Sequence, residues 1–251
     1  IRIGDTVIIQ RAGDVIPKVV KTIIGLRPVN TKKYSLPRFC PICNEQVNKI
    51  EDEAVLRCQN YYCSAQIKGR IKHFISKEGI DVDGFGDKLV DQLVDNNILK
   101  NISNIFQLKE QELANLDRMG DKSARNVINA INASKNMRLS QFINGLGIRN
   151  VGVHASRILD QTFNGNIENI INADYETLIA IHEVGEIMAQ SILDYFDNED
   201  NKRIIQQCID SSISFKDKNI IENSKLSGKT FVITGSLAMM KRTIVKLEIE
   251  K

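Results

Sequence analysis

Four of the five cysteines lie close together in the sequence and have the spacing of a metal site. Two residues separate Cys40 from Cys43, four separate Cys58 from Cys63, and fourteen lie between the two pairs. This ribbon-type spacing brings two short turns, each with two thiolates, to one tetrahedral ion. Four soft thiolates favour Zn²⁺, and because they fill all four positions we expect a structural rather than a catalytic zinc. The alternative is two disulfides or four unrelated thiols.

No other group of residues has the pattern of a catalytic site. The three histidines, His73, His154 and His182, are scattered along the sequence, and none lies near a reactive cysteine. We therefore expect each histidine to be structural. Cys208 follows Ile204 and Ile205 at helical spacing, which predicts a thiol in a hydrophobic core.

The metal is expected to fold its own segment. Its main apolar residues are few, namely Val47, Ile50, Val55 and Leu56. So small a core does not suffice, and metal binding worth about 10–16 kcal/mol would have to supply the difference. The pattern then becomes helical, with Ser64 as the expected N-cap and Ile67, Ile71, Phe74 and Ile75 on one face.

A short turn ending in glycine occurs four times after the cysteines. The turns are Gly84-Phe85-Gly86, Arg118-Met119-Gly120, Asn150-Val151-Gly152 and Glu183-Val184-Gly185. Their last glycines are 34, 32 and 33 residues apart, and each is expected to precede a helix. Four residues beyond each glycine stand Val90, Ala124, Ser156 and Ala189, where a small side chain lets two helices approach closely; Val90 fits least well. The sequence therefore predicts four helix-hairpin-helix repeats.

Such hairpins are suited to binding phosphate. The first turn of each second helix presents backbone N–H groups without helical acceptors, and the helix dipole favours an anion there. DNA phosphates are the natural ligand, and contacts of this kind carry little sequence information. A single turn of this type is more often a plain glycine cap at a helix C-terminus, so the prediction depends on the four turns being in register.

Charge distinguishes the repeats. Residues 118–157 have a net charge of +6, whereas 73–117 have −5 and 158–200 have ten carboxylates and no Lys or Arg. Phosphate binding depends on cations, so we expect repeats two and three to make most of the DNA contact and repeat four to be mainly scaffold. The alternative is that the acidic residues form a solvated face directed away from DNA. The candidate contacts are Gly86, Arg118, Gly120, Lys122, Arg149, Gly152 and Gly185.

Both ends of the chain are predicted to contain strands. In residues 1–39 the apolar residues alternate, a turn is expected at Arg11-Ala-Gly-Asp14, and the segment has the pattern of part of a small β-barrel. Its cations Arg11, Lys18, Lys21 and Arg27 could face a phosphate backbone, or belong to a solvated barrel surface. Residues 211–225 are expected to be a polar loop, and 226–235 a buried strand.

Composition excludes several classes of protein. The chain has 251 residues, of which 42% are hydrophobic and 26% charged, as in an ordinary folded protein. It lacks the run of about 18 apolar residues that a membrane helix needs, and no secretory leader opens it. We expect a cytoplasmic protein without membrane contact. Because Ile1 is not Met, the sequence is expected to be a piece of a longer protein.

The order of these modules resembles the C-terminal half of the bacterial NAD-dependent DNA ligase family. The resemblance runs from Ile1 to about Leu237. The stretches that carry it are Arg11-Ala-Gly-Asp-Val-Ile-Pro17, Cys40-Pro-x-Cys43, Cys63-x-Ala-Gln66, Asp81-Val-Asp-Gly-Phe-Gly86, Arg118-Met-Gly-x-Lys-Ser-Ala124, Leu146-Gly-Ile-Arg-x-Val-Gly152 and Gly228-Lys-Thr-x-Val-Ile-Thr-Gly235.

The resemblance implies a multi-domain α+β protein. Residues 1–39 would be the end of an oligonucleotide-binding (OB) fold, 40–66 the four-cysteine zinc ribbon, 67–215 the mainly α helix-hairpin-helix domain, 216–225 a linker, and 226–251 the truncated start of an α/β BRCT domain. Beyond Leu237 the sequence departs from the acidic helix expected in the family.

The family seals nicks in duplex DNA through a lysine in a K-x-D-G motif. The only Asp-Gly here is Asp83-Gly84, which Asp81 precedes, so this segment has no such nucleophile. The resemblance implies that the segment positions nicked double-stranded DNA, while NAD and Mg²⁺ serve the N-terminal adenylation domain of the same protein. It implies a monomer in the bacterial cytoplasm, associated with the nucleoid. The competing interpretations are a non-enzymatic zinc-ribbon/helix-hairpin-helix repair protein and a protein-interaction adaptor.

Overall fold

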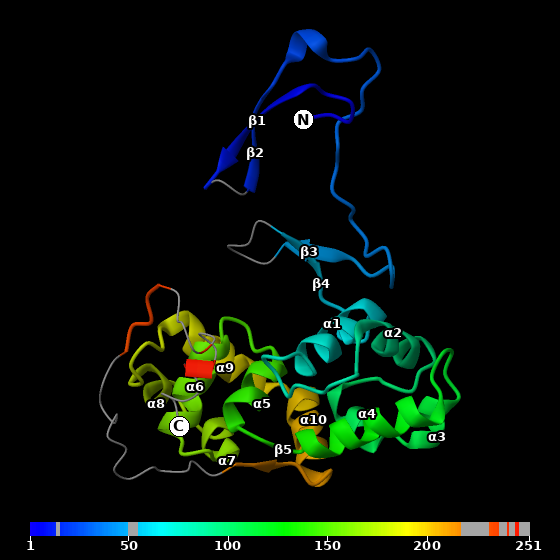
Figure 1. Cartoon of the computed structure of the whole chain (residues 1–251). Coiled ribbons are helices and arrows are strands. Elements are labelled where there is room, and N and C mark those ends of the chain that lie inside the picture. Colours follow the sequence, from blue (N-terminus) through cyan, green and yellow to red (C-terminus); the bar gives the residue numbers. More distant parts are fainter. Residues whose placement is uncertain (14–15, 50–54, 217–230, 236–239, 241–243, 246–251) are drawn as a thin grey trace. The chain divides into compact units, whose positions relative to one another are not determined.

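The computed structural model describes residues 1–13, 16–49, 55–216, 231–235, 240 and 244–245 (Figure 1). The described chain is mixed helix and strand, and it divides into two compact units. The first consists of Ile1–Gly69 and Val90–Lys100, and the second of Arg70–Leu89 and Asn101–Lys251. Among the described residues, no helix has both the length and the apolar character needed to cross a membrane.

An antiparallel hairpin dominates the N-terminal segment. Strand β1 (Val7–Ala12) pairs with β2 (Ile16–Thr22), and the register shifts between Ile8 and Ile9. The short helix η1 (Ile24–Leu26) follows. The turn expected at Arg11 begins later than predicted, because Arg11 and Ala12 still pair with Pro17 and Ile16 of β2.

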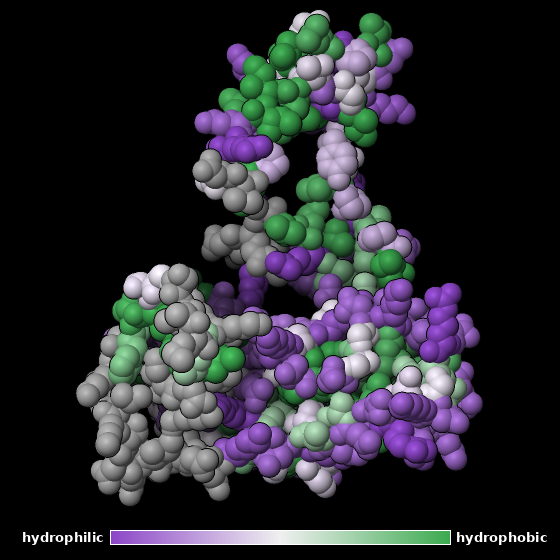
Figure 2. Space-filling view, viewed as in Figure 1, coloured by the Kyte–Doolittle hydropathy of each residue, from purple (hydrophilic) through white to green (hydrophobic). Residues whose placement is uncertain are grey.

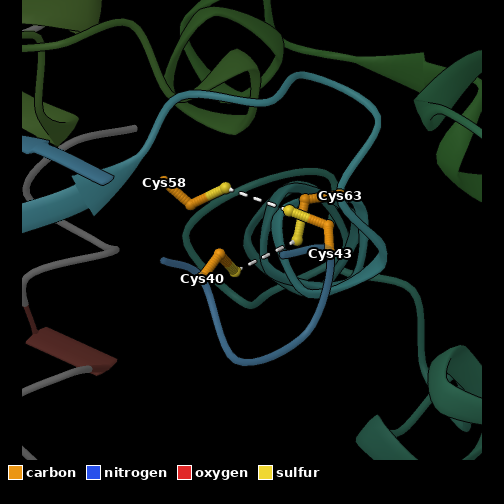
Figure 3. A group of neighbouring side chains, drawn as sticks. All are labelled: Cys40, Cys43, Cys58 and Cys63. Atoms are coloured by element: carbon orange, nitrogen blue, oxygen red, sulfur yellow. Dashed lines mark hydrogen bonds between the residues drawn. The ribbon is translucent and has the colours of Figure 1, made fainter. Parts of the chain in front are cut away.

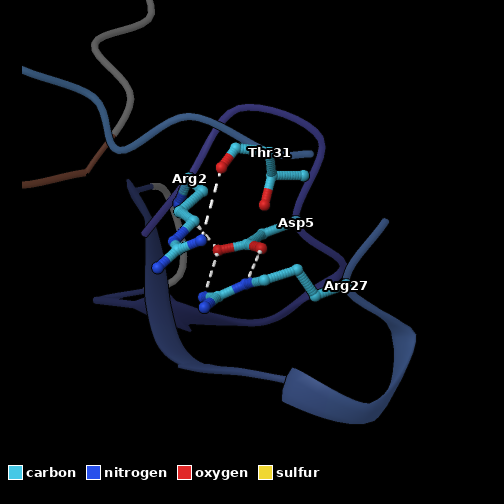
Figure 4. Close-up of polar contacts among 4 residues, drawn as sticks. All are labelled: Arg2, Asp5, Arg27 and Thr31. Atoms are coloured by element: carbon cyan, nitrogen blue, oxygen red, sulfur yellow. Dashed lines mark hydrogen bonds and ion pairs between the residues drawn. The ribbon is translucent and has the colours of Figure 1, made fainter. Parts of the chain in front are cut away.

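A buried carboxylate holds this segment together (Figure 4). The Asp5 side chain is fully buried, and Arg27 donates to it through Nε at 2.7 Å and Nη2 at 2.9 Å. The backbone N–H of Arg2 donates to the same carboxylate at 2.7 Å, and its guanidinium donates to the carbonyl of Thr31. These bonds lower the pKa of Asp5, with Arg27 as the largest cause. The chain before β1 is thereby tied to the loop that follows η1.

The hairpin leaves much of its apolar surface exposed (Figure 2). Ile9 is 60% exposed, Ile16 69% and Val20 53%. The burial of β2 does not alternate, and the described part of residues 1–39 forms a two-stranded sheet rather than a closed barrel. The finer assignment to an OB fold therefore rests on the sequence resemblance.

The cysteine segment contains a second two-stranded sheet. Strands β3 (Val47–Lys49) and β4 (Leu56–Cys58) are antiparallel, with Val47 opposite Cys58. Ile50 lies outside the described residues. Helix α1 (Ser64–Phe74) begins directly after Cys63, so Ser64, the expected N-cap, is instead the first residue of the helix.

The rest of the described chain is mainly helical. Its helices are α2 (Asp87–Asp95), η2 (Ile102–Gln107), α3 (Glu110–Ala114), α4 (Asp121–Ser134), α5 (Leu139–Leu146), α6 (Val153–Thr162), α7 (Ile167–Ile171), α8 (Tyr175–Ile179), α9 (Glu186–Asp197) and α10 (Glu199–Asp210). Side chains cap several of them: the side chains of Asn166 and Asp174 accept bonds from the backbone of α7 and α8, and Asn198 does the same for α10.

Aromatic rings and close backbone contacts form the core of the second unit. Phe74 makes edge contacts with Phe106 and Phe142, at centroid distances of 6.1 and 5.8 Å. Gly145 of α5 lies against the same ring, since a Cβ there would come within 2.9 Å of the Phe74 ring. His73 lies beside this contact, and its Nε2 is 2.7 Å from the carbonyl oxygen of Asn144. His73 is thus structural, as predicted.

Two features near the C-terminal end test the sequence predictions. Cys208 of α10 is fully buried, and desolvation raises its pKa to about 12, which confirms a core thiol.

Within the predicted loop 211–225, Ser214–Phe215 instead forms β6, parallel to β5 (Asn136–Met137), because that strand supplies backbone partners. Most of the predicted strand 226–235 lies outside the described residues, and the described residues 231–235 contain no strand.

Candidate metal centre and nucleic-acid interface

The four cysteines predicted to bind metal come together in the structure (Figure 3). Their sulfur atoms all lie within 4.8 Å of one another, with Cys40 4.0 Å from Cys63 and Cys43 3.5 Å from Cys58. All four are free thiols rather than disulfides. They come from the turn after Phe39, from strand β4 and from the residue before α1.

These distances suit one tetrahedral ion. Zinc–sulfur bonds of about 2.3 Å place neighbouring sulfurs about 3.8 Å apart, close to the observed separations. Backbone N–H groups of Cys43 and Ile42 lower the pKa of Cys40 to about 7, which favours the thiolate that binds metal. Since the cysteines fill all four positions, the site fits a structural zinc with no open coordination position.

The metal centre is continuous with the first helix. The carbonyl of Cys63 accepts a hydrogen bond from the N–H of Ile67 at 2.9 Å, so a metal ligand also begins the helical hydrogen-bond pattern of α1. Cys63 is 1% exposed. A metal held by this residue therefore fixes where α1 starts.

All four predicted hairpins share one backbone geometry. In each, the N–H of the hydrophobic turn residue donates to the carbonyl three residues earlier. These bonds run from Phe85 to Val82, Met119 to Leu116, Val151 to Ile148 and Val184 to Ile181, at 3.1–3.3 Å. Helices α2, α4, α6 and α9 begin at the residue directly after the last glycine of each turn. The four turns predicted from the spacing therefore share one hydrogen bond, and a helix begins directly after each of them.

The first residue of each of these turns has a left-handed backbone. The φ angles are +75° at Gly84, and +62°, +62° and +69° at Arg118, Asn150 and Glu183. Such a value at the third residue of a four-residue turn is typical of type II and favours glycine. Three of the four repeats nevertheless have a polar or charged residue at this position. The sequence pattern shows these residues but did not predict their left-handed backbone.

In the described part of the chain, neither the backbone angles of three of these glycines nor a steric contact requires glycine at the last position of each turn. Gly120, Gly152 and Gly185 have φ between −90° and −97°, which any residue adopts. A Cβ built on them, or on Gly86, meets nothing within 4 Å. The space beside each glycine is therefore open to a ligand, next to the unpaired N–H groups of a helix N-terminus.

The residues at which helices were predicted to approach closely are buried. Val90, Ala124, Ser156 and Ala189, which stand four residues after the glycines, each have 0% exposed surface. Ser156 also donates its hydroxyl to the carbonyl of Gly152, which satisfies its buried oxygen. In three of the four repeats, the helix after the turn therefore has a small buried side chain at this position. In the first repeat the larger Val90 is equally buried.

The predicted cations occupy different environments. Arg118, Lys122 and Arg149 are exposed at or beside the second and third hairpin turns. Arg125 is instead paired with Glu110, at 3.2 Å. Arg11 and Lys18 are exposed in β1 and β2. Arg27, also considered for phosphate, donates two hydrogen bonds to Asp5, so part of its guanidinium is already engaged within the segment.

Sequence reasoning missed two contacts between the third and fourth hairpins. Asn150 of the third turn donates from Nδ2 to Oγ of Ser191 in α9, at 3.0 Å. Glu183 of the fourth turn has its Oε2 2.6 Å from Nε2 of His154 in α6. Each left-handed turn residue thus contacts the helix that follows the other hairpin. Because Asn150 and Glu183 occupy the same position in their repeats, the sequence could have indicated that they share a role. It could not have indicated that their partners are Ser191 and His154.

Comparison with protein families identifies both candidate regions. A model of the NAD-dependent DNA ligase C4 zinc finger domain matches residues 39–65, which include all four cysteines. A model of the helix-hairpin-helix motif matches residues 141–205, which contain the third and fourth hairpins together.

Curated relatives are similar along the whole chain. The chain is 41% identical over 256 residues to the DNA ligase of Lysinibacillus sphaericus, covering 100% of this chain and 38% of that protein. It is 41% identical over 249 residues to the DNA ligase of Cellvibrio japonicus, covering 98% and 36%. A DNA ligase of Geobacter sulfurreducens is also 41% identical, with 100% and 37% covered. The chain thus spans less than two fifths of the length of these relatives. Together with the zinc-finger and helix-hairpin-helix matches, they fit the C-terminal half of a bacterial NAD-dependent DNA ligase.

Proposed function

We propose that this chain is the DNA-holding part of a NAD-dependent DNA ligase, which seals single-strand nicks in duplex DNA during replication and repair. The proposal is carried by the four open glycines at helix N-termini. Nothing in the described chain occupies the space of a Cβ there, so the absence of a side chain is best explained by a ligand that approaches the backbone closely. A phosphate satisfies the N–H groups and the positive end of the helix dipole at once.

Repeats two and three are proposed to make most of the contact. Gly120 and Gly152 lie within the segment of net charge +6, beside Arg118, Lys122 and Arg149. Gly185 lies in the acidic segment, which should weaken phosphate binding at the fourth hairpin. Gly86 lies in an acidic segment, but the cation Lys88 follows it in α2, so we expect its hairpin to bind phosphate with intermediate strength.

The remaining modules are assigned supporting roles. Residues 1–39 are proposed as the end of an OB fold whose Arg11 and Lys18 face the nicked strand. Residues 40–66 are the zinc ribbon, 67–215 the helix-hairpin-helix domain, 216–225 a linker, and 226–251 the start of a BRCT domain. Zinc would be held by the four cysteines, where it fixes the ribbon and the start of α1.

The contribution of this segment to ligation is geometric. Sealing requires the 5′-phosphate and 3′-hydroxyl of the nick to meet in line, and positioning of reacting groups can lower a barrier by several kcal/mol, up to about 11 in favourable cases. In this proposal the adenylated lysine, NAD and Mg²⁺ belong to an adenylation domain elsewhere in the protein. The protein would act as a monomer on nicked duplex in the bacterial cytoplasm.

Glycine-to-alanine changes test the proposal. We expect Gly120→Ala and Gly152→Ala each to weaken binding of nicked duplex at least tenfold, as measured by fluorescence anisotropy, because the methyl group occupies the phosphate position. The free energy of unfolding should fall by no more than about 1 kcal/mol, since alanine caps a helix less well than glycine.

Gly185→Ala is the matched control. It makes the same change at the same position of the acidic fourth hairpin, and we expect it to alter affinity less than threefold. If all three variants bind nicked duplex like the unchanged chain, the hairpins do not hold DNA. If Gly185→Ala alone abolishes binding, the assignment of repeats is wrong.

A further inference from the structure

One position in the first helical turn varies in charge among the four repeats. Two residues after the last glycine of each hairpin stand Lys88, Lys122, His154 and Ile187. All four are exposed. The first two repeats thus carry a permanent cation next to the proposed phosphate site, the fourth an apolar side chain, and the third a side chain whose charge depends on pH.

The histidine in this series faces a carboxylate from the neighbouring hairpin. His154 Nε2 is 2.6 Å from Oε2 of Glu183, and the two side chains are 74% and 49% exposed. His182 Nδ1 is 3.6 Å from the other oxygen of Glu183, and its side chain is 95% exposed. Both imidazoles are therefore in contact with water, and only His154 stands in the lysine position of the repeat.

We propose that His154 is a further phosphate-contacting residue and that its protonation, balanced by Glu183, makes DNA binding by the third hairpin pH-dependent. This inference rests on the proposed function and assigns its regulation. His154 also contributes a backbone N–H in the first turn of α6, so the same residue offers the DNA both a backbone and a side-chain donor.

The sign of the effect follows from the charges at the two hairpins. The other charged groups there are Arg149 in the third turn, Arg157 in α6, His182 in the fourth turn and Glu186 in α9. The arginines remain cationic throughout the neutral range. The carboxylate of Glu183 remains ionised, because His154 lowers its pKa below the usual value. Histidine is the side chain whose charge ordinarily changes near neutral pH, so the proposal places the pH dependence on imidazole.

While the imidazole of His154 is protonated, it and Glu183 form an ion pair with no net charge. Once the imidazole loses its proton, the carboxylate adds one negative charge beside the proposed phosphate site. DNA binding should therefore weaken as the pH rises. One unit charge a few ångströms from a phosphate in water corresponds to about a fivefold change in affinity.

The experiment measures the affinity of the 251-residue chain for a nicked duplex by fluorescence anisotropy at pH 5.5, 6.5 and 7.5, at constant ionic strength. We expect the dissociation constant to rise about fivefold across this range. His154→Gln should remove most of this rise. Glu183→Gln should bind about five times more tightly at pH 7.5 and keep a dependence on pH, because the imidazole still titrates.

His182→Gln is the matched control, because it removes a histidine that touches the same carboxylate from outside the lysine position. Its pH profile should equal that of the unchanged chain, and circular dichroism should show all three variants folded. Equal profiles for the unchanged chain and His154→Gln would overturn the inference while leaving DNA binding intact. A flat profile in His182→Gln alone would also overturn it. Failure of the unchanged chain to bind nicked duplex at any pH would instead defeat the proposed function.

Discussion

The buried carboxylate of Asp5 binds Arg27, a cation that the sequence alone suggests could contact phosphate. Arg27 lies in a basic segment, and composition alone makes it a candidate phosphate contact. In the structure it donates two hydrogen bonds to Asp5, whose side chain has no exposed surface. Leaving a buried charge unpaired is costly, so Arg27 stays with its partner rather than moving to DNA.

This pair predicts a dependence of stability on pH. The folded-state pKa of Asp5 is lowered, so its stabilising effect is complete above the unfolded value of about 3.9 and is lost as the pH falls through the lower folded value. We expect Asp5→Asn to lower the melting temperature at pH 7.

The same comparison at pH 2.5 provides the control. The difference in melting temperature between Asp5→Asn and the unchanged chain should shrink there, because the carboxyl of the unchanged chain becomes protonated as well. A difference of the same size at both pH values would show that shape, rather than charge, accounts for the role of Asp5.

At the scale of single elements, the hairpins depend on small buried side chains. Ala124 of α4 has no exposed surface, whereas Ala133 of the same helix is exposed. Ala124 donates its N–H to the carbonyl of Gly120, so the contact lies one turn beyond the proposed phosphate site. Packing at this alanine therefore influences the position of the N–H groups that would hold DNA.

We expect Ala124→Leu to lower the free energy of unfolding by about 1–3 kcal/mol, because extra methylene groups do not fit a packed contact. Ala133→Leu makes the same change on the exposed face of the same helix and should alter stability by less than about 0.5 kcal/mol. Chemical denaturation measures both. Equal effects would show that helix propensity, rather than packing, determines the result.

Local patterns predicted much of this element structure. The cysteine spacing predicted a site whose sulfurs lie within 4.8 Å, and the glycines predicted the starts of four helices. Both are set by residues near one another in the sequence. The bonds from Arg27 to Asp5 and from His154 to Glu183 join residues 22 and 29 positions apart, so they depend on tertiary packing that periodicity does not encode.

At the scale of the whole molecule, folding and metal binding are linked. The ribbon strands β3 and β4 are three residues each, and Cys63 joins the metal site to α1. The second unit has its own aromatic core around Phe74, and the four clustered cysteines all belong to the first unit. The two units should therefore respond differently to loss of zinc.

We expect the purified chain to contain one zinc per molecule, and Cys43→Ser to lose most of it, because three thiolates bind more weakly than four. Elemental analysis measures the content. Chelation should remove hydrogen-exchange protection from β3, β4 and the first turn of α1, while α5 and α6 retain theirs. Equal loss in all of these elements would show that the metal supports the whole chain.

The crosswise contacts of Asn150 with Ser191 and of Glu183 with His154 have a consequence for the ancestry of the array. Each hairpin supplies partners for the other, so deleting either one would remove both of these contacts from the hairpin that remains. The smallest unit that could be duplicated, transferred or lost without breaking these contacts is therefore the pair formed by the third and fourth hairpins.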